Sequence, residues 1–158
     1  MSHRWAALVL VLALCALTPK HAAGQTSPPR GHKSGGLGQN FPNPFNPETF
    51  IPFEVGDPAG GCVGDGGQHV VSIRILNLIG QLVANPRFQG PAATSTSAVS
   101  ASLNGRFLND LPLPCGRYVA WWDGFYQGTT REAASGIFIY QFYIDRVLVG
   151  TKRMYNKK

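Results

Sequence analysis

The sequence has few of the residues on which catalytic sites depend. Charged residues make up only 14% of the 158 residues, and only 4 residues are histidines. The motifs Gly-x-Ser-x-Gly, His-Glu-x-x-His and Cys-x-x-Cys are absent, which removes the usual signatures of serine hydrolases, zinc proteases and dithiol enzymes. The 8 acidic residues are scattered, and no pair has the spacing of a shared site. We therefore expect no enzyme activity, no metal site and no bound cofactor.

Glycine and proline, by contrast, are plentiful. The chain holds 19 glycines and 12 prolines, while hydrophobic residues make up 44% of it, enough for a packed core. This balance is typical of a turn-rich, all-β domain and not of a helical bundle. The sequence contains no internal repeat.

The first 24 residues have the features of a secretory signal peptide. Arg4 supplies a positive charge, and residues 6–17 form an apolar run. Cleavage before Gln25 would place Ala22 and Gly24 at the small-residue positions −3 and −1. The apolar run is shorter than the roughly 20 residues of a membrane span, and no later run is longer, so we expect no transmembrane segment in the mature chain.

Cys15 leaves a lipoprotein open as an alternative, although Leu14 has the wrong size for the residue before a modified cysteine. Residues 25–38 are Ser, Pro, Gly and scattered basic residues, with only Leu37 to bury. Such a composition cannot offset the entropy lost on ordering, so we predict a disordered spacer. The folded domain is then expected at residues 39–158, one domain's worth of chain.

Residues 39–49, Gln-Asn-Phe-Pro-Asn-Pro-Phe-Asn-Pro-Glu-Thr, precede the first predicted strand. Their three prolines hold φ at about −65° and remove backbone donors, so no helix can pass through. Asn43 and Asn46 each precede a proline and can hold turns. With Phe41 and Phe45 as apolar anchors, this segment is predicted to be a rigid, extended entry arm docked on the domain. A proline-rich linker is the alternative.

Apolar alternation and turn residues predict a series of short strands. The predicted strands are residues 50–55, 69–77, 118–123, 137–144 and 147–154, with a return strand after a turn at Gly80. Pro52 suggests that the first of these lies at a sheet edge, because proline cannot donate to a ladder. A hairpin loop is predicted at 56–68. Short strands at this spacing favour an antiparallel β-sandwich of about seven strands.

Five short motifs occur in order along the chain. They are Asn-Phe-Pro-Asn-Pro-Phe-Asn-Pro at 40–47, Ile-Leu-Asn-Leu-Ile-Gly-Gln at 75–81, Trp122-Asp123-Gly124, Ala-Ser-Gly-Ile-Phe at 134–138, and Lys152-Arg153-Met154. Together they resemble the C-terminal sorting domain of proteins exported by type IX secretion, which is similar in fold to the immunoglobulin-like domain of the flagellar hook-capping protein. The resemblance covers roughly residues 37–158.

The resemblance implies an immunoglobulin-like fold and a non-catalytic sorting role. Members carry a signal peptide and cross the outer membrane of Gram-negative bacteria through the type IX machinery. A sortase-like peptidase then cleaves them, and they are attached or released. The chain would thus be periplasmic in transit and afterwards at the cell surface or extracellular. The residues expected to contact the secretion machinery are Lys152, Arg153, Met154, Lys157 and Lys158.

The sequence departs from this family in two ways. Only a spacer precedes the domain, where family members carry a large enzyme or adhesin. The segments 56–69 and 88–116 are also longer than usual, and each holds a cysteine. A stand-alone extracellular immunoglobulin-like binding or structural module therefore remains an alternative, as does a fragment of a longer cargo protein.

Physical reasoning alone assigns the motif residues to the fold. The residues concerned are Pro42, Asn43, Pro44, Gly80, Trp122, Asp123, Gly124, Ser135 and Gly136. Trp122 is expected to fill the core, and Asp123-Gly124 to form the turn after it. Gly80 permits a positive φ, and Ser135-Gly136 would let the last hairpin begin close to a neighbouring backbone.

The net charge is +6, and losing the leader leaves 12 of the 14 basic residues against 8 acidic ones. Four of these bases lie within residues 152–158. Nucleic-acid binding calls for a basic stripe with aromatic platforms on one surface, so we expect no nucleic-acid partner. The sequence does not indicate an oligomeric state.

Cys62 and Cys115 are the only cysteines after the leader. Export passes through an oxidising compartment, where thiols pair. Each cysteine lies beside glycine or proline, in a loop that can adjust to the Cα separation of roughly 5.5 Å that a disulfide prefers. We predict a disulfide between them, with two independent thiols as the alternative.

Overall fold

The computed structural model describes residues 35–60, 62, 66–92 and 102–158, all within one compact unit, His32–Lys158. The predicted signal peptide and residues 25–34 of the predicted spacer lie outside this part. The described residues form nine strands: β1 (Gly35–Leu37), β2 (Thr49–Val55), β3 (Gln68–Leu76), β4 (Leu82–Ala84), β5 (Arg87–Pro91), β6 (Leu111–Pro114), β7 (Gly116–Trp122), β8 (Gly136–Ile144) and β9 (Val147–Asn156).

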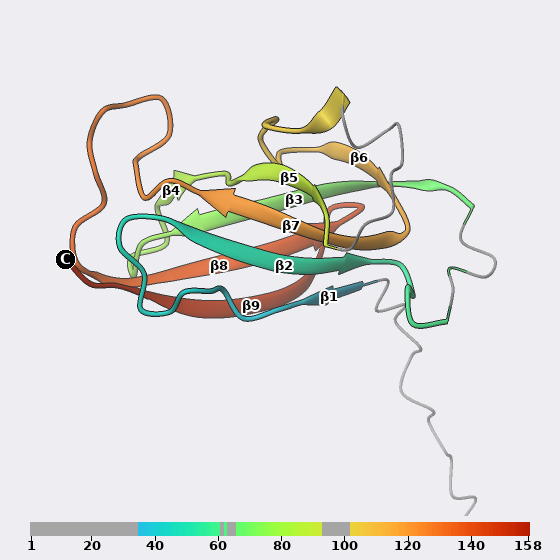
Figure 1. Ribbon diagram of the computed structural model, residues 1–158, viewed down its shortest axis with the longest axis horizontal. Coiled ribbons are helices and arrows are strands. Elements are labelled where there is room, and N and C mark those ends of the chain that lie inside the picture. The colour runs from blue at the N-terminus through green and yellow to red at the C-terminus, as the bar shows by residue number, and fades with distance from the viewer. Residues whose placement is uncertain (1–34, 61, 63–65, 93–101) are drawn as a thin grey trace, which may run out of the picture. The chain divides into compact units, whose positions relative to one another are not determined.

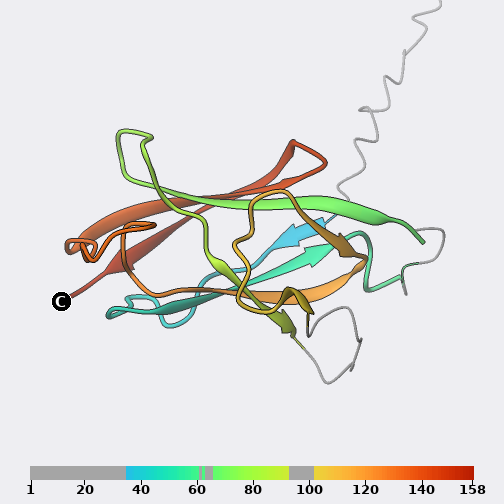
Figure 2. The same cartoon turned by 90° about the horizontal axis from the view of Figure 1, so that it is seen from above.

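The strands make two antiparallel sheets, which confirms the predicted all-β class (Figure 1). Sheet A has the order β1-β2-β7-β5, and sheet B has the order β4-β3-β8-β9, with β6 paired to β3. Seen from above, the sheets form two layers (Figure 2). In the part of the chain that the structure describes, no helix is long and apolar enough to cross a membrane.

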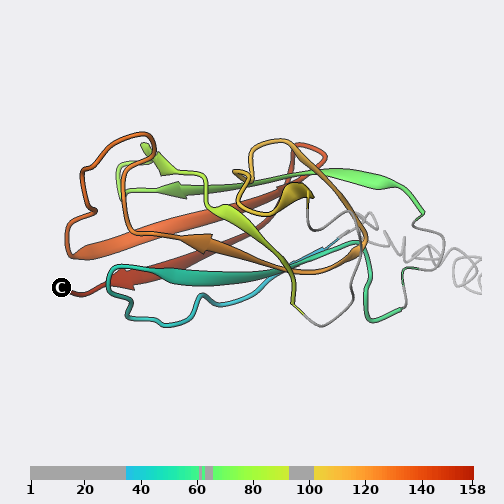
Figure 3. The ribbon, with the colours of Figure 1, turned by 45° about the horizontal axis from the view of Figure 1, so that its top comes forward.

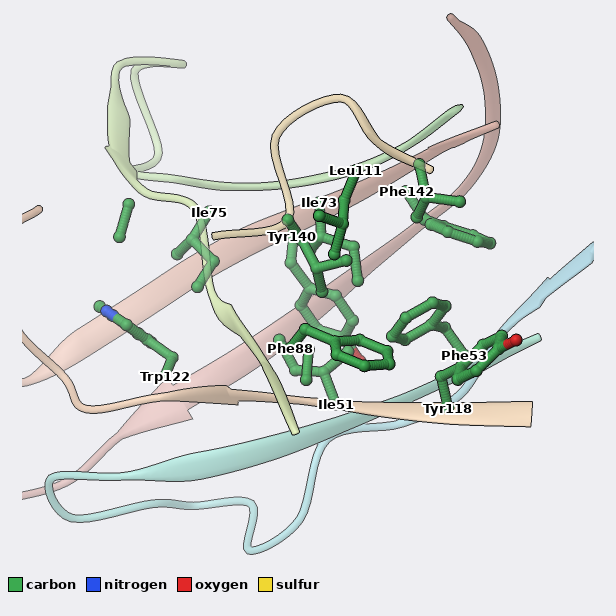
Figure 4. Close-up of a cluster of buried hydrophobic side chains, with 14 of the residues drawn as sticks. Ile51, Phe53, Ile73, Ile75, Phe88, Leu111, Tyr118, Trp122, Tyr140 and Phe142 are labelled. Atoms are coloured by element: carbon green, nitrogen blue, oxygen red, sulfur yellow. The ribbon is translucent and has the colours of Figure 1, made fainter. Parts of the chain in front are cut away.

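The core fills the space between the two layers. The residues predicted to share a face are buried: Val71, Ile73 and Ile75 of β3, and Tyr118, Ala120 and Trp122 of β7. Phe53 of sheet A and Phe142 of sheet B bring their ring centroids to 5.4 Å (Figure 4). Period-2 alternation therefore predicted the inner faces of both sheets correctly.

The predicted edge position of strand 50–55 is wrong, because β2 lies between β1 and β7. Pro52 pairs with Val119, and its carbonyl accepts a hydrogen bond from Gly38 N at 2.8 Å, on the side away from β7. The N and C=O of one strand residue point to the same side, so the nitrogen of Pro52 also faces away from β7. The ladder between β2 and β7 consequently loses no hydrogen bond to this proline.

Three strands, β1, β5 and β6, were missed, and one connection was misjudged. β1 comes from the predicted spacer, so residues 35–37 belong to the folded domain and their predicted disorder is wrong. β6 is Leu-Pro-Leu-Pro, whose leucines are buried and whose prolines hid the alternation. The segment 56–68 is not a hairpin loop, because it joins β2 of sheet A to β3 of sheet B.

The predicted hairpin of β8 and β9 is confirmed. Its turn residues Asp145 and Arg146 have φ of 50° and 66°, as a two-residue type I′ turn requires. Asp145 Oδ2 lies 2.7 Å from His69 Nδ1, and Asp145 Oδ1 accepts a hydrogen bond from Val70 N at 2.9 Å. The hydrogen bond from His69 is the main cause that lowers the pKa of Asp145.

The predicted disulfide between Cys62 and Cys115 is present, with the two Cα atoms 5.9 Å apart. Cys62 lies in the connection between β2 and β3, and Cys115 lies between β6 and β7. The bond thus links the loop that leaves sheet A to the segment that returns to it.

Replacing both cysteines by serine should destabilise the domain. The bond joins residues 53 positions apart, and the chain-entropy model assigns about 4 kcal/mol to a loop of this size. We expect a lower urea midpoint for the variant Cys62→Ser/Cys115→Ser, with no further change on adding reductant. Reductant should lower the midpoint of the unaltered protein to the same value. Equal midpoints for the oxidised protein and the variant would contradict this prediction.

Candidate functional site

The five sequence motifs lie at the same end of the domain, the end that carries the C-terminus (Figure 3). The strand and bridge pairings that connect them are Phe45 with Asn156, Thr49 with Trp122, Leu76 with Ile139, and Phe138 with Met154. We call this end the motif end. Phe45 and Asn156, more than a hundred residues apart in the sequence, are thereby neighbours at this end.

The arm, residues 39–49, covers an open edge at the motif end. β9 is the last strand of sheet B, and an edge strand exposes unpaired N–H and C=O groups. The hydrogen bonds that the arm makes to it are Gln39 Nε2 to Arg153 O (3.0 Å), Tyr155 N to Asn43 Oδ1 (3.0 Å), Phe45 N to Tyr155 O (2.9 Å) and Lys157 N to Phe45 O (3.0 Å). The arm therefore takes the place of a neighbouring strand.

The arm docks as predicted, but it is not extended. Phe41 and Phe50 form an antiparallel bridge, so the chain doubles back between them. The three Xaa-Pro bonds of the arm are cis. Phe45 is only 1% exposed, whereas Phe41 is 53% exposed and stacks on Phe50. The arm thus has one buried anchor, and the alternative of a free proline-rich linker is wrong.

Asn40 fixes the start of the arm from a buried position. Its Nδ2 donates to Pro42 O at 3.1 Å and to Thr49 Oγ1 at 2.9 Å. Its backbone N donates to Tyr140 Oη at 3.0 Å, and that hydroxyl donates to Gly38 O at 2.9 Å. Burial raises the pKa of Tyr140 to about 12, against a smaller opposing effect of the Asn40 N–H. The hydroxyl therefore stays protonated and able to donate near neutral pH.

Phe45 is held by aromatic packing inside the motif end. Its ring centroid lies 5.4 Å from that of Trp122, which lies 5.4 Å from that of Phe138. Trp122 fills the core as predicted, and its Nε1 donates to Phe125 O at 2.9 Å. A buried indole needs such a partner for its N–H.

The turn predicted at Asp123-Gly124 also supports the arm. Asp123 Oδ1 accepts a hydrogen bond from Phe125 N at 3.0 Å, and Gly124 has a φ of +82°. A Cβ on Gly124 would collide with the carbonyl oxygen of Pro47. Glycine is required here both for its φ and for the close approach of the arm.

The C-terminal residues bind the segment before β8. Asn156 is buried, and its Nδ2 donates to Ala133 O at 3.0 Å and to Ala134 O at 3.2 Å. Lys158 N donates to Ser135 Oγ at 3.1 Å. The sequence-based reasoning missed Asn156, whose only signal was a polar residue at an inward position of the last strand.

Gly136 was predicted to allow a close approach of a neighbouring backbone, and the structure gives it a different role. Gly136 pairs with Asn156, but a Cβ added to Gly136 would meet nothing within 4 Å, so a close approach is not what requires glycine here. Its φ of +154° is a backbone conformation that favours glycine, and this explains why glycine occupies the position. The predicted turn at Gly80 is confirmed by its φ of +79° and by Asn77 Oδ1, which accepts hydrogen bonds from Ile79 N and Gln81 N.

The basic residues expected to contact the secretion machinery differ in exposure. Arg153, Lys157 and Lys158 are exposed, and Lys152 is half-buried. Lys158 Nζ lies 3.0 Å from Glu132 Oε2. Met154 is completely buried, so it belongs to the core and not to a recognition surface. The predicted cleavage residues Ala22, Gly24 and Gln25 lie outside the described residues.

Within the described ranges, no group of three or more His, Cys, Asp or Glu residues is placed to hold a metal ion. The motif end combines buried aromatic rings, backbone hydrogen bonds and exposed basic side chains. No protein-family model, no curated protein and no solved structure matches the chain.

The two phenylalanines of the arm should differ sharply in their effect on stability. Phe45→Ala removes a buried ring, which costs about 3–5 kcal/mol of unfolding free energy. Phe41→Ala removes a half-exposed ring from the same arm and should cost under about 1 kcal/mol. Urea unfolding measures both. In hydrogen exchange, Phe45→Ala should also remove protection of the Tyr155 and Lys157 amides. Similar losses for the two variants would contradict the assignment of Phe45 as the anchor.

Two glycines of the loop after β7 provide a matched test of the contact with the arm. Gly124→Ala and Gly128→Ala both place alanine at a positive φ, 82° and 72°. This backbone change costs about 1–2 kcal/mol in each. Only Gly124→Ala also pushes against Pro47, which should cost about 1–3 kcal/mol more. Equal thermal unfolding midpoints for the two variants would show that the contact with Pro47 does not matter.

Proposed function

We propose that this chain is a sorting domain that directs its own export by type IX secretion. The domain would have an immunoglobulin-like β-sandwich fold, and residues 1–24 would deliver it to the periplasm. The type IX machinery would then carry it across the outer membrane of a Gram-negative bacterium. A sortase-like peptidase would attach it to the cell surface or release it. The observation that carries this proposal is the position of all five motifs at one end of the domain (Figure 3).

The contacts of the arm favour recognition of a folded surface. The backbone of Arg153, Tyr155 and Lys157 is held by the arm, and Lys158 is held by Ser135. These contacts give the exposed side chains of Arg153, Lys157 and Lys158 fixed backbone positions. A receptor with complementary negative charge could then bind them without ordering the tail first, which lowers the entropic cost of binding.

Met154 and Asn156 are buried, so the end of β9 belongs to the folded core and is not a free tail. Removing residues 152–158 would delete both from the core, so a loss of export after truncation would not separate recognition from misfolding. Replacing only the exposed charges leaves the core intact. This replacement is therefore the sharper test.

The variant Arg153→Gln/Lys157→Gln/Lys158→Gln should keep its thermal unfolding midpoint and lose surface display. A matched control, Arg106→Gln/Arg117→Gln/Arg146→Gln, removes the same charge from exposed positions elsewhere. The full chain is produced in a host with a working type IX system, and protease accessibility on intact cells is compared with periplasmic content. We expect the first variant to accumulate in the periplasm and the control to reach the surface.

Surface display of both variants would contradict the proposal, as would display in a strain that lacks the type IX translocon. Either result would favour the stand-alone extracellular module. A specific observation supports that second candidate, namely a cavity lined by aromatic residues on sheet A.

A further inference from the structure

A cavity of about 360 Å³ lies beside the motif end, lined by β5 and β7 of sheet A, by Ala84 at the end of β4 and by the loop after β7. Arg87 of β5 and Trp121 of β7 are directly paired and both line it. Their neighbours Phe88 and Trp122 are buried in the core. Because successive strand residues point to opposite faces, Arg87 and Trp121 project away from the core. The volume falls in the range of about 300–1,000 Å³ that is typical of small-molecule sites.

The loop after β7 forms the other wall of the cavity, and hydrogen bonds hold it in place. Gln127 N donates to Val83 O at 3.0 Å, and Gln127 Oε1 accepts from Asn85 N at 2.7 Å. Tyr126 N donates to Arg131 O at 2.9 Å. The wall is therefore formed before any ligand arrives, which reduces the entropy lost on binding.

Five aromatic residues line the cavity: Phe107, Trp121, Trp122, Phe125 and Tyr126. Polar contacts hold Trp121 and Phe107 in place. Trp121 Nε1 donates to Glu48 Oε2 at 2.9 Å. The Arg87 guanidinium lies 4.2 Å from the centroid of the Phe107 ring, and its Nη1 donates to Gly105 O at 3.1 Å. The cavity thus presents rings with restricted freedom beside a fixed cation.

The polar lining combines donors and acceptors with no excess of charge. It consists of Asn85, Arg87, Asp123, Gln127, Thr129 and Thr130. Arg87 and Asp123 are the only charged residues of the lining, and their charges have opposite signs. A charged ligand would therefore gain little net electrostatic attraction. Amides, hydroxyls, a guanidinium and a carboxylate together suit a ligand that has several hydroxyl groups, each able to donate and to accept.

We propose that this cavity binds a neutral pyranose sugar, either free or at the end of a glycan. A pyranose has an apolar face of C–H groups that can pack on Trp121 or a neighbouring ring. Its hydroxyl groups lie around its edge, where the polar lining can reach them. A phosphate would need more positive charge than Arg87 supplies, and an apolar ligand would leave the polar lining unpaired. The inference does not depend on the proposed role in secretion.

The test titrates the oxidised mature chain with the methyl α- and β-glycosides of glucose, galactose, mannose, rhamnose and N-acetylglucosamine. Saturation-transfer NMR detects binding, and tryptophan fluorescence gives the dissociation constant. We expect at least one glycoside to bind saturably, with a Kd of about 1 mM or below. Trp121→Ala and Gln127→Ala should each weaken that binding by about tenfold or more. Trp121→Phe keeps a ring and should weaken it less.

Tyr155→Ala serves as the control, because Tyr155 is a 44% exposed aromatic residue on β9 of the other sheet. It should bind the same glycoside with unchanged affinity. The unfolding midpoint of every variant is measured. If Trp121→Ala does not fold, the affinity of Gln127→Ala for the glycoside is the test of the site. The proposal is overturned when no glycoside binds, or when binding survives unchanged in both Trp121→Ala and Gln127→Ala.

Discussion

The packing of Phe45 against Trp122 is the contact on which the motif end depends. The hydrogen bonds of the arm to β9 lie at an edge where water is the alternative partner. Each such bond adds only about 1 kcal/mol net. Full burial of a phenylalanine ring contributes about 1.5–3 kcal/mol, and no contact with water replaces this contribution when the ring is exposed. The ring therefore sets where the arm docks, and the hydrogen bonds set its register along β9.

This arrangement deals with two problems of a domain whose last strand is at a sheet edge. An uncovered edge invites pairing with another chain, and a C-terminal tail tends to fray. The arm covers the backbone of Arg153, Tyr155 and Lys157, while Asn156 holds residues 133–134 from inside. The exposed bases of the tail are consequently presented by a folded surface, as the proposed sorting role needs.

The sequence predicted those features that a local pattern determines. Alternation gave the inward residues of β3 and β7, and glycine and aspartate marked the turns at Gly80 and Asp123-Gly124. The disulfide could be predicted because Cys62 and Cys115 are the only cysteines after the predicted leader. Features that depend on distant partners could not be predicted. β1 has only three residues, and Pro52 is harmless in β2 only because its nitrogen faces away from β7. The meeting of the motifs at one end follows from the strand order, which no local pattern specifies.

The neighbouring residues Trp121 and Trp122 connect the two surfaces of the motif end. They point to opposite faces of β7. Trp122 packs on Phe45 of the arm in the core and also borders the cavity, while Trp121 lines the cavity from the outer face. Glu48, also in the arm, accepts the hydrogen bond of Trp121 Nε1. One segment thus holds both tryptophans. Coupling between two sites is reciprocal, so a ligand that orders Trp121 would favour the docked arm, and the docked arm would favour that ligand by the same factor. If the cavity binds the proposed sugar, the arm is the element that would connect that cavity to the C-terminal surface.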